Sequence, residues 1–238
     1  MNALILAAGR GTRLRARHDR PKCLLEIDGV ALIDRYVRTL ESIGVGITIV
    51  VGYRAEDVQA HLARLAPTVG CRVVINEAYE LGSIVSLARG LESVDGPLLL
   101  LDGDVLFHPD LLRRLAASAH DNALLVDVGS VFTGEEYMTG IESGRVRALR
   151  RAAVEGYAAT GEWVGFARLN TDAVDRLRDA IGRQIAGGDT AGGYEDTLAS
   201  LLPDVHVQVE TAADLPWVEI DFPEDAARGE ALFRSGLL

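Results

Sequence analysis

A dense group of cationic side chains follows the first apolar stretch of the chain. It comprises Arg10, Arg13, Arg15, Arg17, Arg20 and Lys22. Lys22 is the only lysine of the chain, in which lysine and arginine together number 24. A lysine ammonium is a compact charge on a flexible stem, so this position favours a point charge over a planar guanidinium. In a chain of formal net charge −11, such local positive charge is typical of a phosphate-binding site.

Small residues and glycines lie between that apolar stretch and the cationic group. The segment reads Leu6, Ala7, Ala8, Gly9, Arg10, Gly11, Thr12 and Arg13. A strand that runs directly into glycines lets backbone N–H groups approach an anion closely. Gly9 and Gly11 supply the backbone freedom that such a loop needs. By itself the segment is also compatible with an ordinary glycine-rich surface turn.

Two common phosphate-binding motifs are excluded by particular residues. A dinucleotide-binding fingerprint needs a third glycine where Leu14 stands, and an acid at the end of the second strand, where residues 50–53 read Val-Val-Gly-Tyr. A P-loop needs glycine before its lysine and Ser or Thr after it. Lys22 is instead preceded by Pro21 and followed by Cys23.

Two pairs of acidic residues lie far apart in the sequence at the ends of apolar strands. Asp102 and Asp104 follow the run 97–101, and Glu219 and Asp221 share one face of a later short strand. Open α/β sheets bind ligands at the carboxyl ends of their strands. Mg²⁺ takes one or two carboxylates together with phosphate oxygens. Each pair alone could be solvated, but beside a phosphate loop the two pairs predict a magnesium site.

Apolar runs of strand length alternate with amphipathic stretches in the first half of the chain. The expected strands are 3–7, 47–51, 72–75, 97–101 and 123–126, and the expected helices are 32–43, 55–65, 83–91 and 109–117. Continuously apolar strands that alternate with helices indicate a parallel sheet covered on both faces.

The pattern changes after residue 126. Strands are expected at 130–142, 145–150, 162–169 and 217–220, and helices at 172–185, 194–201 and 223–233. The first two strands would pair through a Ser143-Gly144 turn. The glycine-rich stretch 186–193 predicts a loop.

Taken in their order along the chain, these motifs resemble those of a known enzyme superfamily. The loop from Leu6 to Arg13, followed by Pro21 and Lys22, is similar to the signature of the sugar-nucleotidyltransferases. Further matching segments are Val51-Gly52-Tyr53, Asn76-Glu77 with Tyr79, Ser83 to Leu87, Asp102 with Asp104, and Glu219 with Asp221. Over residues 2–233 the chain resembles the phosphocholine and phosphonate cytidylyltransferase group. One departure is Gly82-Ser83, where the family often carries amide side chains.

The resemblance implies a Rossmann-like α/β fold, with a mixed, mostly parallel sheet flanked by helices. It implies one nucleotidyltransferase domain over residues 1–238. Residues 1–127 would form the nucleotide-binding core, about 128–215 a small β-rich acceptor-binding insertion, and 216–238 the return to the core.

The resemblance also implies roles for individual residues. Lys22 and Arg13 would be the catalytic cations. Asp104 and Asp221 would bind Mg²⁺, with Glu219 and Asp102 assisting. The nucleotide-binding set would comprise Leu6, Ala7, Ala8, Gly9, Gly11, Thr12, Gly52, Tyr53, Asn76, Ser83 and Asp102.

The expected reaction is transfer of CMP from CTP to a small phosphorylated or phosphonylated acceptor, with release of pyrophosphate. Phosphocholine-like compounds and aminoalkyl phosphonates are the acceptors that the resemblance favours. No general base is needed, because an acceptor phosphate is already ionised at neutral pH. A sugar-1-phosphate or inositol-phosphate nucleotidyltransferase is one alternative, and a non-catalytic nucleotide-sensing subunit is another.

The expected acceptor-binding residues are Tyr137, Trp163, Tyr194, Glu195 and Arg150. Aromatic faces bind a quaternary ammonium through cation–π contacts, although a tryptophan in a strand is more often part of the core. Glu195 stands where a further aromatic ring could complete a cage, which favours a primary ammonium. Arg150 and Arg151 could bind the acceptor phosphate or could form a solvated strand end.

The acidic net charge argues against nucleic acid and anionic membranes as partners. No apolar run approaches the roughly 20 residues of a membrane span, and the opening residues do not form a signal peptide. Cys23 and Cys71 have no metal-binding or redox spacing. A cytoplasmic enzyme is therefore expected, and a homodimer is compatible with the sequence.

Overall fold

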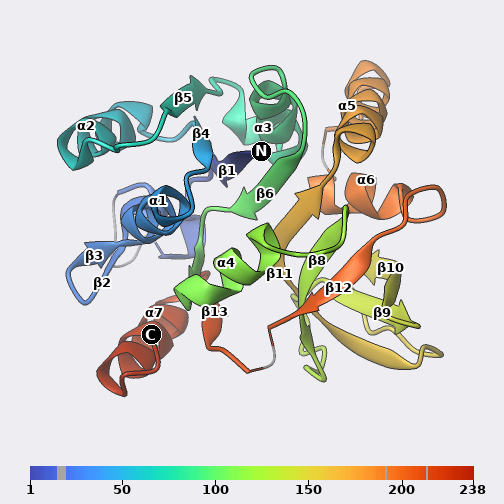
Figure 1. Ribbon diagram of the computed structural model, residues 1–238. Coiled ribbons are helices and arrows are strands. Elements are labelled where there is room, and N and C mark those ends of the chain that lie inside the picture. Colours follow the sequence, from blue (N-terminus) through green and yellow to red (C-terminus); the bar gives the residue numbers. More distant parts are fainter. Residues whose placement is uncertain (15–19, 191, 213) are drawn as a thin grey trace.

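A mixed sheet runs through the computed structural model, which describes residues 1–14, 20–190, 192–212 and 214–238 (Figure 1). His18, Arg15 and Arg17 of the cationic segment lie outside the described residues. The strands of this sheet are β1 (Asn2–Ala7), β4 (Gly46–Val51), β5 (Cys71–Ile75), β6 (Leu98–Asp102), β8 (Ala123–Val128), β9 (Met138–Glu142), β10 (Arg145–Arg150), β11 (Ala159–Leu169) and β12 (Gln208–Thr211). Their order is β5-β4-β1-β6-β11-β8-β12-β10-β9, and β11 also pairs with β9.

Two short pairings lie outside this sheet. β2 (Glu26–Ile27) pairs with β3 (Val30–Ala31), and β7 (Val105–Phe107) pairs with β13 (Trp217–Glu219). The helices are α1 (Leu32–Ser42), α2 (Ala55–Leu65), α3 (Ser83–Leu91), α4 (Pro109–Ala116), α5 (Thr171–Ala186), α6 (Tyr194–Ser200) and α7 (Pro223–Arg234). Single 3₁₀ turns span Thr12–Leu14, Lys22–Leu24 and Tyr79–Leu81.

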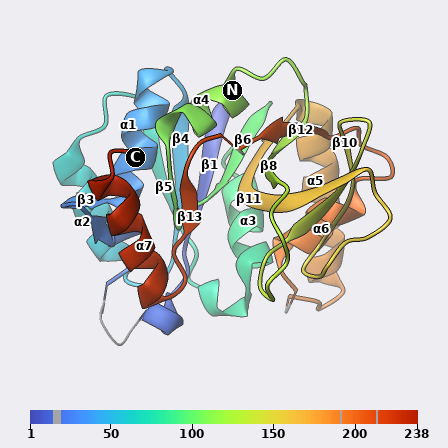
Figure 2. The ribbon, with the colours of Figure 1, turned by 90° about the horizontal axis from the view of Figure 1, so that it is seen from below.

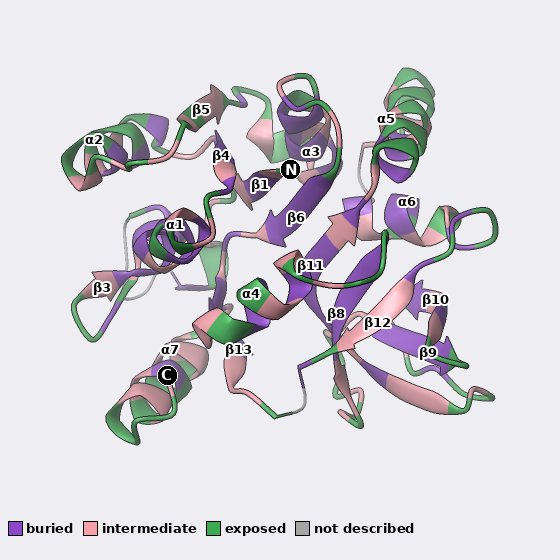
Figure 3. Ribbon diagram, in the orientation of Figure 1, coloured by how far each residue is buried: buried purple, intermediate pink, exposed green. Residues whose placement is uncertain are grey.

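The first half of the sheet is parallel, as the sequence predicts. β1 pairs in parallel with β4 and β6, and β4 with β5. Successive β1 residues point to opposite faces, so that Ile5 packs with α1, α2 and α4 and Leu4 packs with α3, α5 and α6 (Figure 2). Both faces of β1, β4 and β6 are covered, which explains why these strands are largely apolar and mostly buried, whereas the edge strand β5 is only partly buried (Figure 3).

The second half departs from the parallel pattern. β11 lies between β6 and β8 and is antiparallel to both. It extends beyond the core strands to pair with β9, so that one long strand belongs to both halves of the sheet (Figure 1). Its register shifts between Trp163 and Ala167, around Gly165, whose φ is +85°. This irregularity bends the strand next to the proposed site.

Several element predictions are confirmed and others are wrong. Helices 55–65 and 83–91 and strand 145–150 have the predicted bounds. The strand predicted at 130–142 begins only at Met138, because residues 133–136 form a turn held by the carboxylate of Glu136. The short strands β2, β3, β7 and β12 were not predicted.

Candidate active site

The glycine-rich loop is fixed at the carboxyl ends of β1, β4 and β6. Tyr53 N donates to Ala8 O at 3.1 Å, and Gly103 N donates to Leu6 O at 2.9 Å. A Cβ atom at Gly52 would lie 2.5 Å from Cβ of Tyr79. Only glycine fits there, because the three strand ends and the Tyr79 side chain pack directly against one another.

A buried tyrosine holds the turn that carries Asp104. The hydroxyl of Tyr36 lies 2.5 Å from Asp102 O and 2.9 Å from Val105 O, and it accepts a hydrogen bond from Val105 N at 3.1 Å. Burial, followed by the charge of Asp104, raises the pKa of this hydroxyl far above its ordinary value, so it stays protonated. The turn that follows β6 is therefore held by a neutral side chain of α1.

The pairing of β7 with β13 brings the second pair of acids to the first. Glu219 lies opposite Val105 in this antiparallel pair, and Ile220 N donates to Asp104 O at 3.0 Å. At the start of α7, the Asp225 carboxylate accepts the backbone N–H of Asp221 at 2.9 Å. Backbone contacts thus fix the chain on both sides of Asp221.

Lys22 lies between the two pairs of acids. Its Nζ is 2.8 Å from Asp104 Oδ2 and 2.5 Å from Asp221 Oδ1, and its side chain is 12% exposed. Burial acts to lower the pKa of this ammonium, but the charges of Asp104 and Asp221 outweigh it and raise the pKa. The structure thus brings Lys22, Asp104 and Asp221 together, although they are distant in the sequence.

Three carboxylates at this point form a group that could hold a metal ion. Ligand atoms of Asp104, Glu219 and Asp221 all lie within 4.8 Å of one another. Loss of solvation, followed by the charges of Asp104 and Asp221, raises the pKa of Glu219 to about 8. Asp104 Oδ1 is buried and has no hydrogen-bond partner among the described residues. Crowded negative charge and a free acceptor oxygen fit a hard divalent cation.

A cavity of about 280 Å³ opens beside the glycine-rich loop. Its lining includes the expected nucleotide- and metal-binding residues Leu6, Ala8, Gly9, Ser83, Asp102, Asp104 and Glu219, the expected acceptor residues Tyr194 and Glu195, and also Tyr79, Glu80, Gly82 and Ser86. Ala7, the last residue of β1, does not line it, and neither do Gly11, Thr12, Gly52 and Tyr53 in the nearby turns. Asn76 lies behind the wall, 2% exposed, where its Nδ2 donates to Ser86 Oγ at 3.0 Å.

A second cavity, of about 160 Å³, lies between the carboxylate group and β11. It is lined by Arg13, Asp102, Val105, Glu135, Tyr137, Arg151, Glu162, Trp163, Val164, Gly165, Glu195, Glu219 and Asp221. The two cavities share Asp102, Glu195 and Glu219. A ligand in one cavity can therefore meet a ligand in the other beside the carboxylate group.

The expected acceptor residues are only partly brought together. Tyr137 and Glu195 line the second cavity, but exposed Arg150 does not, and its neighbour Arg151 does. Trp163 is 5% exposed and donates through Nε1 to Phe166 O. Tyr194 is 1% exposed and lies edge-on to Trp163. Both rings are largely buried, although Trp163 contributes to the lining of the second cavity and Tyr194 to that of the first.

The hydroxyl of Tyr194 reaches across to the strand that carries the acids. It donates to Asp102 Oδ1 at 2.8 Å, while Tyr194 N donates to Ser83 Oγ at 3.2 Å. Burial, followed by the charge of Asp104, raises the pKa of Asp102 far above its ordinary value. A Cβ atom at Gly165 would lie 2.6 Å from Asp102 Oδ2. Asp102 is thus enclosed, and it connects the walls of both cavities.

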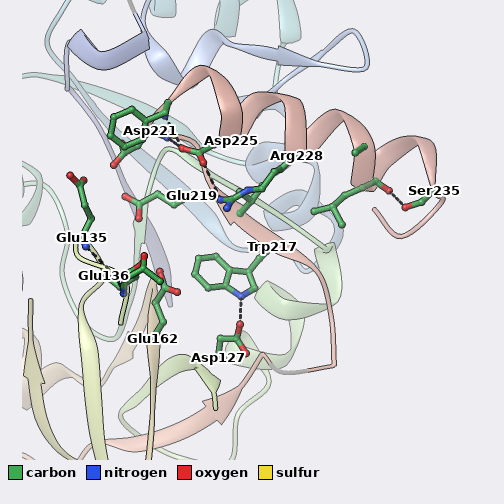
Figure 4. A pocket seen from close by; sticks show the side chains of 15 residues that line it. Asp127, Glu135, Glu136, Glu162, Trp217, Glu219, Asp221, Asp225, Arg228 and Ser235 are labelled. Atoms are coloured by element: carbon green, nitrogen blue, oxygen red, sulfur yellow. Dashed lines mark hydrogen bonds and ion pairs between the residues drawn. The ribbon is translucent and has the colours of Figure 1, made fainter. Parts of the chain in front are cut away.

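A larger cavity, of about 770 Å³, adjoins the carboxylate group on the side of α7 (Figure 4). Asp127, Glu136, Glu162 and Asp225 contribute to its acidic lining, and Trp217 Nε1 donates to Asp127 Oδ2 at 3.2 Å. Burial, followed by the charges of Glu136 and Asp127, raises the pKa of Glu162 to about 7. Glu162 was not among the expected site residues. Its position next to Trp163 in an expected strand was the only indication in the sequence that it could line a cavity.

The described residues include no helix long and apolar enough to cross a membrane.

Residues 3–185 match the model of a MobA-like NTP transferase domain. The chain belongs to this family. The predicted resemblance to nucleotidyltransferases is therefore confirmed.

Two curated relatives align with 98% of this chain. One is the bifunctional IPC transferase and DIPP synthase of Rubrobacter xylanophilus, 31% identical, of which 52% is covered. The other is the CMP-5'-(3-aminopropyl)phosphonate synthase of Streptomyces rubellomurinus, 27% identical, of which 39% is covered. The chain thus spans about half the length of the curated relatives that it matches, or less.

Solved structures show the same fold. The CTP:phosphocholine cytidylyltransferase of Streptococcus pneumoniae superposes with a TM-score of 0.79 at 21% identity, covering 98% of each chain. The inositol-1-phosphate CTP transferase of T. maritima gives a TM-score of 0.77 at 23% identity, covering 100% of this chain and 97% of the other. The expected Rossmann-like α/β fold of the nucleotidyltransferases is confirmed.

Proposed function

We propose that this protein transfers CMP from CTP to a small acceptor that bears a phosphate or phosphonate, releasing pyrophosphate. The observation that carries the proposal is the position of Lys22 between Asp104 and Asp221, beside two adjoining cavities. The names of the two curated relatives, one a CMP-phosphonate synthase, support a nucleotide donor of this kind.

In the proposed reaction an acceptor oxygen attacks the α-phosphorus of CTP. A new P–O bond forms to the acceptor, the bond between the α-phosphorus and the bridging oxygen to the β-phosphate breaks, and pyrophosphate leaves with the electron pair. Two anions must approach each other, so positive groups have to offset their repulsion. Lys22 and Arg13 supply that charge, and the backbone of residues 8–11 forms the cradle for the triphosphate.

Asp104, Asp221 and Glu219 would hold Mg²⁺ in this proposal, since their ligand atoms already lie within 4.8 Å of one another. When bound, the ion would neutralise phosphate charge and hold the reacting groups in line. The Lys22 ammonium lies between Asp104 and Asp221 in this structure, and we propose that it turns to the phosphates in the loaded enzyme.

Residues about 128–215 would recognise the acceptor, while residues 1–127 and 216–238 would hold the nucleotide and the metal. Glu195 Oε2 is buried and has no hydrogen-bond partner among the described residues. It could accept a hydrogen bond from a primary ammonium or from a hydroxyl group. With Trp163 and Tyr194 buried, a cage for a quaternary ammonium has less support, and we favour an aminoalkyl phosphonate.

An inositol phosphate is the second candidate acceptor. The hydrogen-bonding capacity of Glu195 suits a ring hydroxyl as well as an ammonium. The fold shared with an inositol-1-phosphate CTP transferase makes this acceptor worth testing. A non-catalytic nucleotide sensor has the least support, because it would not need the carboxylate group with its lysine.

A substrate screen tests the proposal. The purified protein would be assayed for pyrophosphate release with Mg²⁺ and each of CTP, UTP, GTP, ATP and dTTP. The acceptors would be 2-aminoethylphosphonate, phosphocholine, inositol 1-phosphate and glucose 1-phosphate. Turnover that needs CTP and one of the first three acceptors supports the proposal. Turnover only with glucose 1-phosphate, or with no nucleotide at all, would contradict it.

A further inference from the structure

One carboxylate oxygen at the mouth of the second cavity is held by two guanidinium groups. Glu135 Oε2 lies 2.7 Å from Arg13 Nη1 and 3.2 Å from Arg151 Nη2. Arg13 belongs to the loop after β1, and Arg151 directly follows β10. Two parts of the chain that are distant in sequence thus direct positive groups at the same point.

The backbone that carries Glu135 is fixed independently of these arginines. The Glu136 carboxylate accepts hydrogen bonds from the backbone N–H groups of Thr133, Gly134 and Glu135, at 2.8, 2.9 and 3.1 Å. Burial acts to raise the pKa of Glu136, but these bonds and that from the Thr133 hydroxyl outweigh it and lower the pKa to about 2. The turn therefore keeps its shape when the Glu135 side chain moves.

The charge of this cavity is unfavourable for an anionic acceptor. Six of its lining residues are acids and two are arginines, Arg13 and Arg151. The acids are Asp102, Glu135, Glu162, Glu195, Glu219 and Asp221. Both arginines pair with Glu135, and Arg13 also pairs with Asp221, so a phosphate that enters finds no unpaired guanidinium among the described lining residues. Displacement of Glu135 would remove this partner from Arg151 and leave Arg13 with Asp221 alone.

The position of the Glu135 carboxylate also suits the reaction. Arg13 Nη1 lies 3.0 Å from Asp221 Oδ2 as well as 2.7 Å from Glu135, so the anion held by the two arginines adjoins the carboxylate group (Figure 4). A phosphate in that position would lie next to the place where the nucleotide and metal are proposed to bind. Guanidinium groups bind phosphate oxygens through short, charge-assisted hydrogen bonds.

We infer that the phosphate or phosphonate of the acceptor binds between Arg13 and Arg151, in the position that the Glu135 carboxylate holds in this structure. Arg151 is then an acceptor-binding residue, and Glu135 is an internal competitor that must turn away before the acceptor binds. The inference rests on the proposed function for the identity of the acceptor.

Replacement of the Glu135 carboxylate by a phosphate between the two arginines is energetically reasonable. The side chains of Arg13, Glu135 and Arg151 are 44%, 49% and 47% exposed, and exposed ion pairs contribute little stability. A phosphate dianion offers three oxygens and roughly twice the charge of the carboxylate that it replaces. The acceptor can therefore displace Glu135 without disturbing the fold.

Steady-state kinetics with the full chain test the inference. We expect Glu135→Gln to lower the KM for the acceptor about three- to tenfold, because the competitor loses its charge. Arg151→Ala should raise that KM at least tenfold. Both variants should leave the KM for CTP within a factor of two of the wild-type value. Matched controls are Glu142→Gln and Arg147→Ala, an exposed pair on the β9–β10 hairpin 4.0 Å apart.

A binding measurement separates this inference from the proposed function. Calorimetric titration with methylphosphonate needs neither a correct acceptor nor turnover. Glu135→Gln should bind it at least threefold more tightly than wild type, and the double variant with Arg151→Ala should lose that gain. If the substrate screen fails but this pattern appears, the anion site stands and the proposed reaction does not.

Two results would overturn the inference. One is equal affinity of wild type and Glu135→Gln for methylphosphonate. The other is a higher KM for the acceptor in Glu135→Gln, which would mean that Glu135 contacts the acceptor directly. Thermal denaturation of each variant should match wild type within about 2 °C, the shift expected for less than 1 kcal/mol in a chain of this size.

Discussion

Two ion-pair clusters lie side by side in this protein and differ in how they are held. In one, Lys22 pairs with Asp104 and Asp221 and is only 12% exposed. In the other, Arg13 and Arg151 pair with Glu135, and about half of each side chain is exposed. The first cluster is largely enclosed by the protein, whereas the second is open to an incoming anion.

The difference comes from the backbone around each cluster. Asp104 and Asp221 follow strands whose ends are fixed by the β7–β13 pairing and by the Asp225 carboxylate at the start of α7. Arg151 and Glu135 stand outside the regular strands, at the end of a hairpin and in a turn. The backbone around the Lys22 cluster is thus fixed by strand pairing and by Asp225, whereas Arg151 and Glu135 have no such pairing.

The largest expected effect is that of removing Lys22 from its cluster with Asp104 and Asp221. Lys22→Ala should lower kcat/KM by about 10²–10³-fold, because it removes a positive group from developing phosphate charge. Arg20→Ala is the matched control: it removes an exposed cation from the same segment, 4.0 Å from Glu26, and should retain activity. Pyrophosphate release measures both. If Lys22→Ala kept a tenth or more of wild-type activity, Lys22 would have no role in the chemistry.

The second prediction asks whether the same cluster holds the metal. Asp221→Asn should raise the Mg²⁺ concentration for half-maximal activity about 10-fold or more, since it weakens one of three carboxylate ligands. A chelator should abolish wild-type turnover, and added Mg²⁺ should restore it. Asp214→Asn, which removes an exposed partner of Arg114, should leave the Mg²⁺ dependence unchanged. Activity that persists in the presence of chelator would contradict this prediction.

A third prediction concerns Asp102, which lines both adjoining cavities. Tyr194→Phe removes the donor to the partly buried Asp102 Oδ1, at a cost of about 0.5–1.5 kcal/mol for the lost hydrogen bond. The Tm should fall by about 2–4 °C per kcal/mol. Tyr157→Phe, on a tyrosine that lines neither of the two adjoining cavities, serves as control. An unchanged Tm in Tyr194→Phe would show that this hydrogen bond contributes no net stability.

The smallest expected effect is on the pH dependence of stability and concerns Glu162, which lines the second cavity. The pKa of Glu162 is raised from its ordinary 4.5 to about 7, so the folded state binds more protons than the unfolded state between these values. Its contribution to stability is therefore present at low pH and is lost as pH rises from about 4.5 to about 7. Glu162→Gln should flatten the fall of Tm over this range. The exposed Glu155→Gln should reproduce the wild-type slope, and an unaltered slope in Glu162→Gln would refute the assignment.

Much of the fold could be predicted because it follows from local patterns. Helices 55–65 and 83–91 have a clear apolar periodicity, and the central parallel strands β1, β4 and β6 are largely apolar on both faces. Four strands of two to four residues, β2, β3, β7 and β12, were missed, because too few positions exist to show any period. The direction of β11 could not be predicted either, since the residues of a strand do not specify whether its neighbours run parallel or antiparallel.

Part of the candidate site could likewise be predicted from local sequence patterns. Its cations and acids belong to contiguous motifs, so Lys22, Asp104 and Asp221 could be chosen from the sequence. At the end of β10, however, Arg150 was chosen and Arg151 lines the cavity. Nothing local distinguishes two adjacent arginines at a strand end, where the path of the following loop decides which one faces the ligand.

By itself the sequence determined the phosphate loop, the two acidic pairs, the alternation of strands and helices, and hence the family. Only the tertiary structure decided that Tyr194 is buried against Asp102, and that Glu135 lies between Arg13 and Arg151. Motifs encode chemistry and local backbone form over a few neighbouring residues. Which distant side chains meet depends on strand pairing and on the course of loops, and these are set by the packing of the whole chain.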